Sequence, residues 1–80
     1  MDWFDEMAAA LASGTTEIEL TDIELPVHVR DEILDLARIA SHDSGERINA
    51  PLLCYALGIA VGRGATLEAL AQIVRSRTKA

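Results

Sequence analysis

The chain has 80 residues, enough for one small domain, and half of them are hydrophobic, mostly Ala, Leu, Ile and Val. The net charge of −6 argues against nucleic-acid binding, because phosphates attract clustered Lys and Arg side chains. The single cysteine, Cys54, excludes an internal disulfide and a cysteine-based zinc or iron–sulfur site, and its apolar surroundings predict a buried small side chain.

Residues 2–13, "DWFDEMAAALAS", predict the first helix. Asp2 suits the N-cap position, and Gly14 suits the C-terminal stop. One apolar stripe recurs at the spacing i, i+4 and i+8. It consists of Trp3, Met7 and Leu11, with Phe4 and Ala8 beside them.

Residues 15–25, "TTEIELTDIEL", alternate polar and apolar side chains, which is the period of a strand. A single short strand has no partner elsewhere in the chain. The sequence therefore favours an extended linker held to the helices by its apolar side chains, and the alternative is a strand added to a partner's sheet edge.

A second helix is predicted over about residues 26–42, because Pro26 suits its first turn and Gly45 suits its end. Asp31 and Asp35 have possible local ion-pair partners on the same helix. These partners are Arg30 and Arg38.

A third helix is predicted over about residues 50–62, with Asn49 as its cap. No charged residue occurs between Pro51 and Gly62, so this segment is apolar nearly all the way round. It is far shorter than the roughly 20 residues that a membrane-spanning helix needs. Gly58 and Gly62 lie on one face and predict the close approach of another helix. The segment is expected to be buried, in this chain or against a partner.

The fourth helix is predicted over about residues 66–77, with Thr66 as its cap and basic residues in its last turn. The predicted fold is therefore all-α. It is a compact four-helix domain over residues 1–80, with an extended linker between the first two helices. The acidic start lacks the basic region of a signal peptide, so we expect a cytoplasmic protein.

No residues with a catalytic or metal-binding pattern are found. His42 and Asp43 could form a general base with its carboxylate, but no nucleophile accompanies them, and a histidine at a helix C-terminus explains the pair. His28 lies at the other end of the same predicted helix, too far from His42 to share a metal. Arg63 can bond to the last carbonyls of its helix, or bind a partner's carboxylate or phosphate.

Residues 33–64 read "ILDLARIASHDSGERINAPLLCYALGIAVGRG". The order "LDLARxxxH", an acid-Arg turn, "APL" and an apolar helix ending in "GxAxGRG" resembles a family of short bacterial helical proteins. Members of that family occur alone, beside formate dehydrogenase genes, or fused behind the nucleotidyltransferase that makes molybdopterin guanine dinucleotide. The early Trp3 also fits the family's opening.

The resemblance implies a non-catalytic accessory role, as a small subunit or cofactor-delivery helper of a molybdenum or tungsten enzyme such as formate dehydrogenase. It implies that this chain binds no cofactor itself and that its larger partner carries molybdopterin. Nucleic acid and membrane are not expected as partners. The predicted partner-binding residues are Leu52, Tyr55, Gly58, Gly62, Arg63, His42 and Arg47.

Two alternatives stay open on the sequence. The chain could be a ligand-binding module that holds part of a molybdopterin nucleotide near Arg47 and Arg63. It could also be a homo-oligomer that associates through the face containing Gly58 and Gly62.

Overall fold

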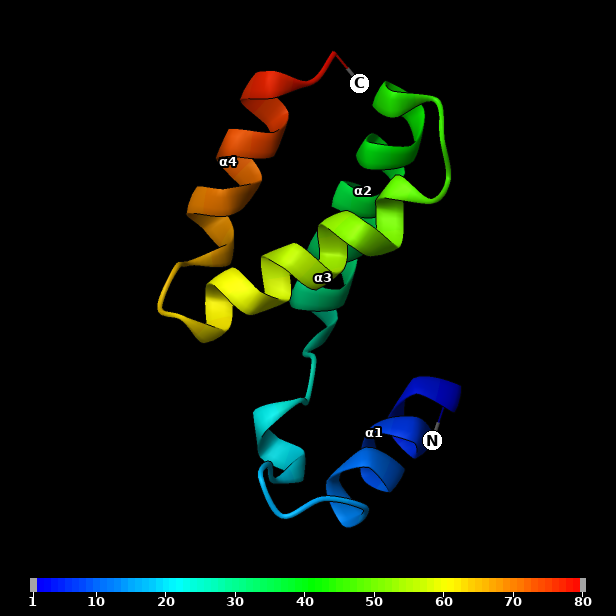
Figure 1. Ribbon diagram of the computed structural model, residues 1–80, viewed down its shortest axis with the longest axis vertical. Helices are drawn as coiled ribbons and strands as arrows, with labels where there is room; N and C mark the ends of the chain where they lie inside the picture. Colours follow the sequence, from blue (N-terminus) through cyan, green and yellow to red (C-terminus); the bar gives the residue numbers. More distant parts are fainter. Residues whose placement is uncertain (1, 80) are drawn as a thin grey trace.

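The computed structural model describes residues 2–79, in which four α-helices follow one another and no strand occurs (Figure 1). This confirms the predicted all-α fold. The elements are α1 (Trp3–Ser13), the 3-10 helix η1 (Leu20–Asp22), α2 (Val27–Ser44), α3 (Asn49–Gly62) and α4 (Leu67–Arg77).

Helices α2, α3 and α4 pack against one another around a small apolar core. Leu36 and Ile39 come from α2, Leu57 from α3 and Ala71 from α4, and all four are buried. Half-buried apolar side chains surround them. These are Ile33, Leu53, Leu67, Leu70 and Val74. Because α2 and α4 each turn an apolar stripe toward the inner side of α3, the three helices form one packed unit.

The helices end at the expected caps Asp2, Gly14, Gly45 and Thr66. The Oδ1 atom of Asp2 accepts a hydrogen bond from the backbone N–H of Asp5 at 2.8 Å, and the Oγ1 atom of Thr66 accepts one from Ala69 at 3.2 Å. Gly45 has a φ of 75°, the left-handed conformation that ends a helix after Ser44. Each cap satisfies backbone groups that a helix end leaves unpaired.

The expected cap of the third helix is wrong. Asn49 is the first residue of α3, and Ile48 occupies the cap position without a side-chain hydrogen bond. The turn is instead closed by the backbone, where the N–H of Asn49 donates to the carbonyl of Glu46 at 3.2 Å.

The segment expected to be an extended linker contains η1 instead of remaining extended throughout. Glu19 precedes η1, and its backbone N–H donates to the Oδ2 atom of Asp22 at 2.8 Å, which is half of a capping box. The alternating pattern therefore reflects a short turn of helix, because local side-chain bonds offer the backbone an alternative to a strand. No strand is present here to extend a sheet.

Helix α1 and η1 form an arm that stands apart from the three-helix unit (Figure 1). The only helix against which α1 packs, among the described residues, is η1. The molecule measures 40 × 26 × 20 Å, and its radius of gyration is 13.7 Å. A compact domain of this length would have a radius of gyration of about 11.6 Å. The fold therefore consists of a three-helix core and a projecting N-terminal arm.

Arg30, at the start of α2, joins the arm to the three-helix unit. Its Nη1 atom lies 2.6 Å from Oδ2 of Asp2, its Nη2 atom pairs with Asp5, and its Nε donates to the carbonyl of Leu25 at 2.9 Å. Its guanidinium also lies 5.0 Å from the centre of the Phe4 ring, within range of a cation–π contact. The hydrogen bonds that Arg30 donates to Asp2 and then to Asp5 raise the pKa of its guanidinium.

A second ion-pair cluster joins α4 to α2. The Nη2 atom of Arg75 pairs with Glu32 and lies 2.8 Å from Oδ2 of Asp35, and Arg38 lies 3.0 Å from Oδ1 of the same carboxylate. The hydrogen bond from Arg75, followed by that from Arg38, lowers the pKa of Asp35. Of the local pairs expected on this helix, only the one between Asp35 and Arg38 forms, because Arg30 bonds across to α1.

The free energy of unfolding should fall at acidic pH, because Asp35 becomes protonated there. Its pKa is lower in the folded chain than the value of about 3.9 for an unfolded aspartate, so the folded state binds fewer protons in that range. The stability it contributes is therefore complete above about pH 4 and is lost as the pH falls through the lower, folded pKa. We expect the urea midpoint to stay level from neutral pH to about pH 4 and then to fall.

The variant Asp35→Asn should be less stable at neutral pH and show a shallower fall in acid, as measured by the same urea midpoints. Asp31→Asn is the matched control, because Asp31 lies on the same helix and forms no ion pair within residues 2–79. An acid profile of Asp35→Asn that is as steep as that of the wild type would contradict the assignment.

Candidate functional site

One side of α3 is apolar and lies open to solvent. Leu52, Tyr55 and Ile59 are spaced i, i+3 and i+7, so they share one face of the helix, and their exposed fractions are 63%, 75% and 49%. Gly58 and Gly62 lie beside them and are also exposed. We call these five residues the α3 face.

The opposite side of α3 supplies its contribution to the core. Leu57 is buried there, and Leu53, Cys54 and Ala60 are half-buried. The helix thus uses one side for its own fold and leaves the other without cover among residues 2–79. The expectation of a buried segment therefore holds for one side of α3 only.

The two glycines do not bring a helix of this chain close, contrary to the expected tight packing. A Cβ atom built on either Gly58 or Gly62 would meet no other atom within 4 Å apart from the local helix itself. Gly58 lies in the interior of α3, where glycine costs about 1 kcal/mol relative to alanine, and no close approach of another element within residues 2–79 offsets that cost. The open space in front of both glycines leaves a flat strip on the α3 face.

The charged residues expected at the site lie around the ends of α3. Arg47 lies just before α3 and Arg63 just after it, so a helix of 14 residues, about 21 Å long, separates them. The backbone N–H of Arg63 closes the helix by donating to the carbonyls of Ile59 and Ala60, both at 3.1 Å. Neither arginine forms an ion pair with another described residue.

His42 is placed apart from the α3 face. It lies in the last turn of α2 and, with Arg38, Asp43 and Lys79, lines an open hollow of about 450 Å³ beside the C-terminal segment. The Oδ1 atom of Asp43 accepts a hydrogen bond from the backbone N–H of Lys79 at 3.0 Å. The carboxylate of Asp43 therefore binds the backbone of Lys79 and does not orient the imidazole of His42.

Cys54 lies on the half-buried side of α3. Burial raises the pKa of its thiol, so the thiol stays protonated near neutral pH and is a weak nucleophile. The sequence predicted a buried side chain here, and the structure shows one that is only half-buried.

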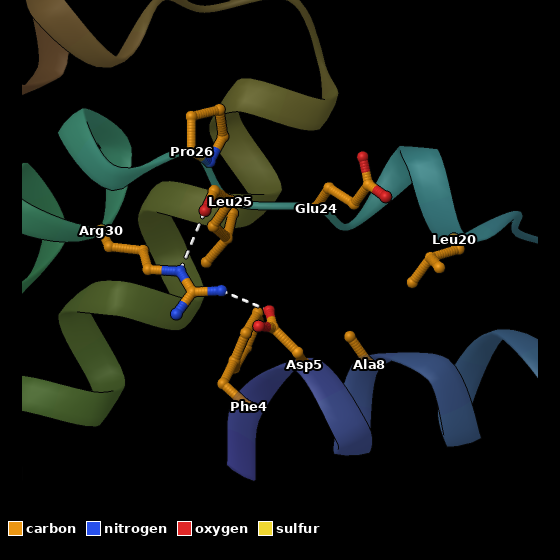
Figure 2. Close-up of a pocket in the computed structure, with 8 residues that line it drawn as sticks. All are labelled: Phe4, Asp5, Ala8, Leu20, Glu24, Leu25, Pro26 and Arg30. Carbon is orange, nitrogen blue, oxygen red and sulfur yellow. Dashed lines mark hydrogen bonds and ion pairs between the residues drawn. The ribbon is translucent and has the colours of Figure 1, made fainter. Parts of the chain in front are cut away.

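A cavity of about 420 Å³ lies where the arm meets the start of α2 (Figure 2). It is lined by Phe4, Asp5, Ala8, Leu20, Glu24, Leu25, Pro26 and Arg30. Its one cationic group is already paired with two carboxylates and the Leu25 carbonyl. Sequence reasoning missed this cavity, because its residues come from three elements that only the folded chain brings together.

Part of the apolar stripe predicted on α1 also lies open to solvent. Trp3, Met7 and Leu11 are 71%, 40% and 56% exposed, whereas Ala8, on another side of the helix, is only 3% exposed. Phe4 and Ala8 line the cavity toward η1 and the start of α2, whereas the other large apolar side chains of α1 lie exposed. We call Trp3, Met7 and Leu11 the α1 stripe.

Within residues 2–79, no group of three or more His, Cys, Asp or Glu side chains is arranged to hold a metal ion. None of the helices in this part of the chain is both long and apolar enough to cross a membrane. The candidate site is thus a surface: the α3 face, with an unpaired arginine at either end of its helix.

A family model described as a domain of unknown function, DUF6457, matches residues 1–80. No curated protein and no solved structure matches the chain. The family match covers every element described above, including the arm.

Proposed function

We propose that this chain, which belongs to the DUF6457 family, is a non-catalytic interaction protein that offers its α3 face to a larger protein. The observation that carries the proposal is the exposure of Leu52 and Tyr55, at 63% and 75%, on a helix without a charged residue. Soluble domains rarely leave a contiguous apolar face uncovered unless it binds something.

The composition of the α3 face suits a protein interface. Tyrosine is enriched among residues that carry binding energy, because it offers a large rigid surface and a hydroxyl group. The strip at Gly58 and Gly62 allows a partner helix to approach the backbone closely. In this proposal Arg47 and Arg63 serve as charged rim residues, because rim charges set the orientation and association rate of a complex.

The proposed partner is a molybdenum or tungsten enzyme such as formate dehydrogenase, or the machinery that delivers its cofactor. Support for this partner comes from the resemblance carried by residues 33–64, which span most of α2 and all of α3. In this proposal the protein acts in the cytoplasm as a small subunit or delivery helper. The partner carries the molybdopterin, and this chain binds no cofactor itself.

The alternative of a ligand module near Arg47 and Arg63 has less support. About 21 Å of helix separates the two arginines, so they do not converge on one phosphate or carboxylate group. Calorimetric titration with molybdopterin guanine dinucleotide tests this alternative directly, and heat of binding would favour it.

The proposal predicts that a tagged chain recovered from its native host retains a molybdoenzyme. The eluate would be identified by mass spectrometry and assayed for molybdenum. Tyr55→Glu should reduce the retained enzyme on the order of 30-fold, because a charge then replaces an aromatic anchor in the contact.

Leu34→Glu is the matched control, because Leu34 is 67% exposed on α2, outside the α3 face, and its substitution should leave retention unchanged. A wild-type chain that elutes alone and free of molybdenum would contradict the proposed partner. Equal losses for both variants would remove the α3 face from the proposal.

A further inference from the structure

We infer that, in the free protein, a second copy of this chain covers the α3 face with its own α1 stripe, and that the two copies do so reciprocally. The inference rests on the proposed function in that it concerns the same face. It adds a mode of regulation, since a larger partner must displace the second copy before it can dock.

The two surfaces match in length and chemistry. The α1 stripe is spaced i, i+4 and i+8 over a helix of 11 residues, about 16 Å long, and the α3 face runs along a helix of about 21 Å. Trp3 of one copy would enter the open strip in front of Gly58 and Gly62 of the other. An amphipathic helix lying on an apolar face is a common mode of recognition.

The exposed area of the chain is large enough for a dimer. The accessible surface is 6067 Å² for a mass of 8.6 kDa, whereas a compact monomer of that mass exposes about 4,700 Å². The excess is about 1,400 Å², and a stable interface needs about 800 Å² from each partner. Two reciprocal contacts between an arm and an α3 face would bury an area of this order.

Charge favours an antiparallel contact. The arm carries acidic residues but no Lys or Arg from residue 2 to residue 25, whereas α3 has an arginine beyond either end. Glu6 borders the α1 stripe near the N-terminus of α1. Antiparallel docking brings Glu6 close to Arg63 of the second copy, and it also sets the positive end of one helix dipole beside the negative end of the other.

The position of the arm explains why the contact is made between copies. Arg30 holds α1 at the start of α2 through Asp2 and Asp5, and in this arrangement α1 does not reach the α3 of its own chain (Figure 1). A second copy related by a two-fold axis can supply the missing helix. Because the exchange is reciprocal, both surfaces are filled and the assembly closes as a dimer.

The test is the mass in solution of the purified full chain. Sedimentation at about 100 µM, well above the Kd of a modest interface, should give twice 8.6 kDa. Trp3→Glu and Tyr55→Glu should each raise the Kd of the dimer on the order of 30-fold. Mixing the two variants should give more dimer than either variant alone, because the heterodimer keeps one wild-type contact and a contact broken by one substitution loses little more from the second.

Leu34→Glu serves as the control and should leave the mass doubled, and circular dichroism checks that every variant stays helical. A wild-type protein that is monomeric at that concentration would overturn the inference. This holds both for a monomer with a solvent-exposed α3 face and for one whose own arm covers that face. A dimer that breaks with Tyr55→Glu but survives Trp3→Glu would also overturn it, since the copies would then meet through α3 alone. Neither result bears on whether a molybdoenzyme is retained from the native host.

Discussion

Replacing Leu36 with alanine is expected to lower the free energy of unfolding by about 3 kcal/mol. Leu36 has no exposed surface and lies at the centre of the core formed by α2, α3 and α4. Its truncation removes buried apolar contacts and leaves a cavity that the surrounding helices fill only in part. A chain of this size would show a fall in Tm of about 15 °C in a thermal scan followed by circular dichroism.

Leu34→Ala is the matched control, because it makes the same change on the same helix at a position that is 67% exposed. Its free energy of unfolding should stay within about 0.5 kcal/mol of the wild type. Similar losses for the two variants would show that the core of the three-helix unit is not where these contacts place it.

Replacing Arg30 with glutamine should release the arm while the three-helix unit stays folded. The change removes both ion pairs to α1 and the stacking on Phe4. An isolated helix shorter than about 12 residues is only marginally stable in water, and α1 has 11 residues. The amides of α1 should therefore exchange with solvent as in an unfolded peptide, while those of α3 keep their protection.

Hydrogen exchange for this prediction is best measured in the Tyr55→Glu background, so that a second copy cannot protect the arm. Arg38→Gln is the control, because Arg38 pairs with Asp35 three residues away on its own helix and does not contact the arm. Protection of α1 that survives Arg30→Gln would mean that apolar contacts with η1 alone hold the arm.

The helices were predictable because their signals are local. Capping residues such as Asp2 and Thr66, the stop at Gly45 and the 3.6-residue apolar period all act within a few positions along the chain. The same reasoning failed at Asn49, where a backbone turn closes the helix start without help from a side chain.

The position of the arm was not predictable, because it depends on contacts between distant residues. Arg30 had equally plausible partners on its own helix, and nothing in the local sequence indicates that it reaches Asp2 and Asp5. Periodicity likewise shows that Trp3, Met7 and Leu11 share one face of α1, but it does not show what covers that face.

Part of the α3 face could be predicted from the sequence. Leu52 and Tyr55 stood out because a helix apolar on all sides exceeds what four short helices can cover, and the structure places both on one exposed side. Ile59 was overlooked, although its spacing from Tyr55 puts it on the same side. His42 and Arg47 were grouped with this face by sequence motif alone.

The separation between the arm and the three-helix unit has a consequence for how the chain folds as it is made. The contacts of α1 with the unit require Arg30, and the core of the unit is complete only when Ala71 has joined it. During synthesis residues 3–13 therefore emerge before the contacts that hold α1 exist, and a helix of 11 residues is only marginally stable until those contacts form. The unit itself consists of three consecutive helices, and small helical domains of this kind fold within microseconds to milliseconds once the last helix is released.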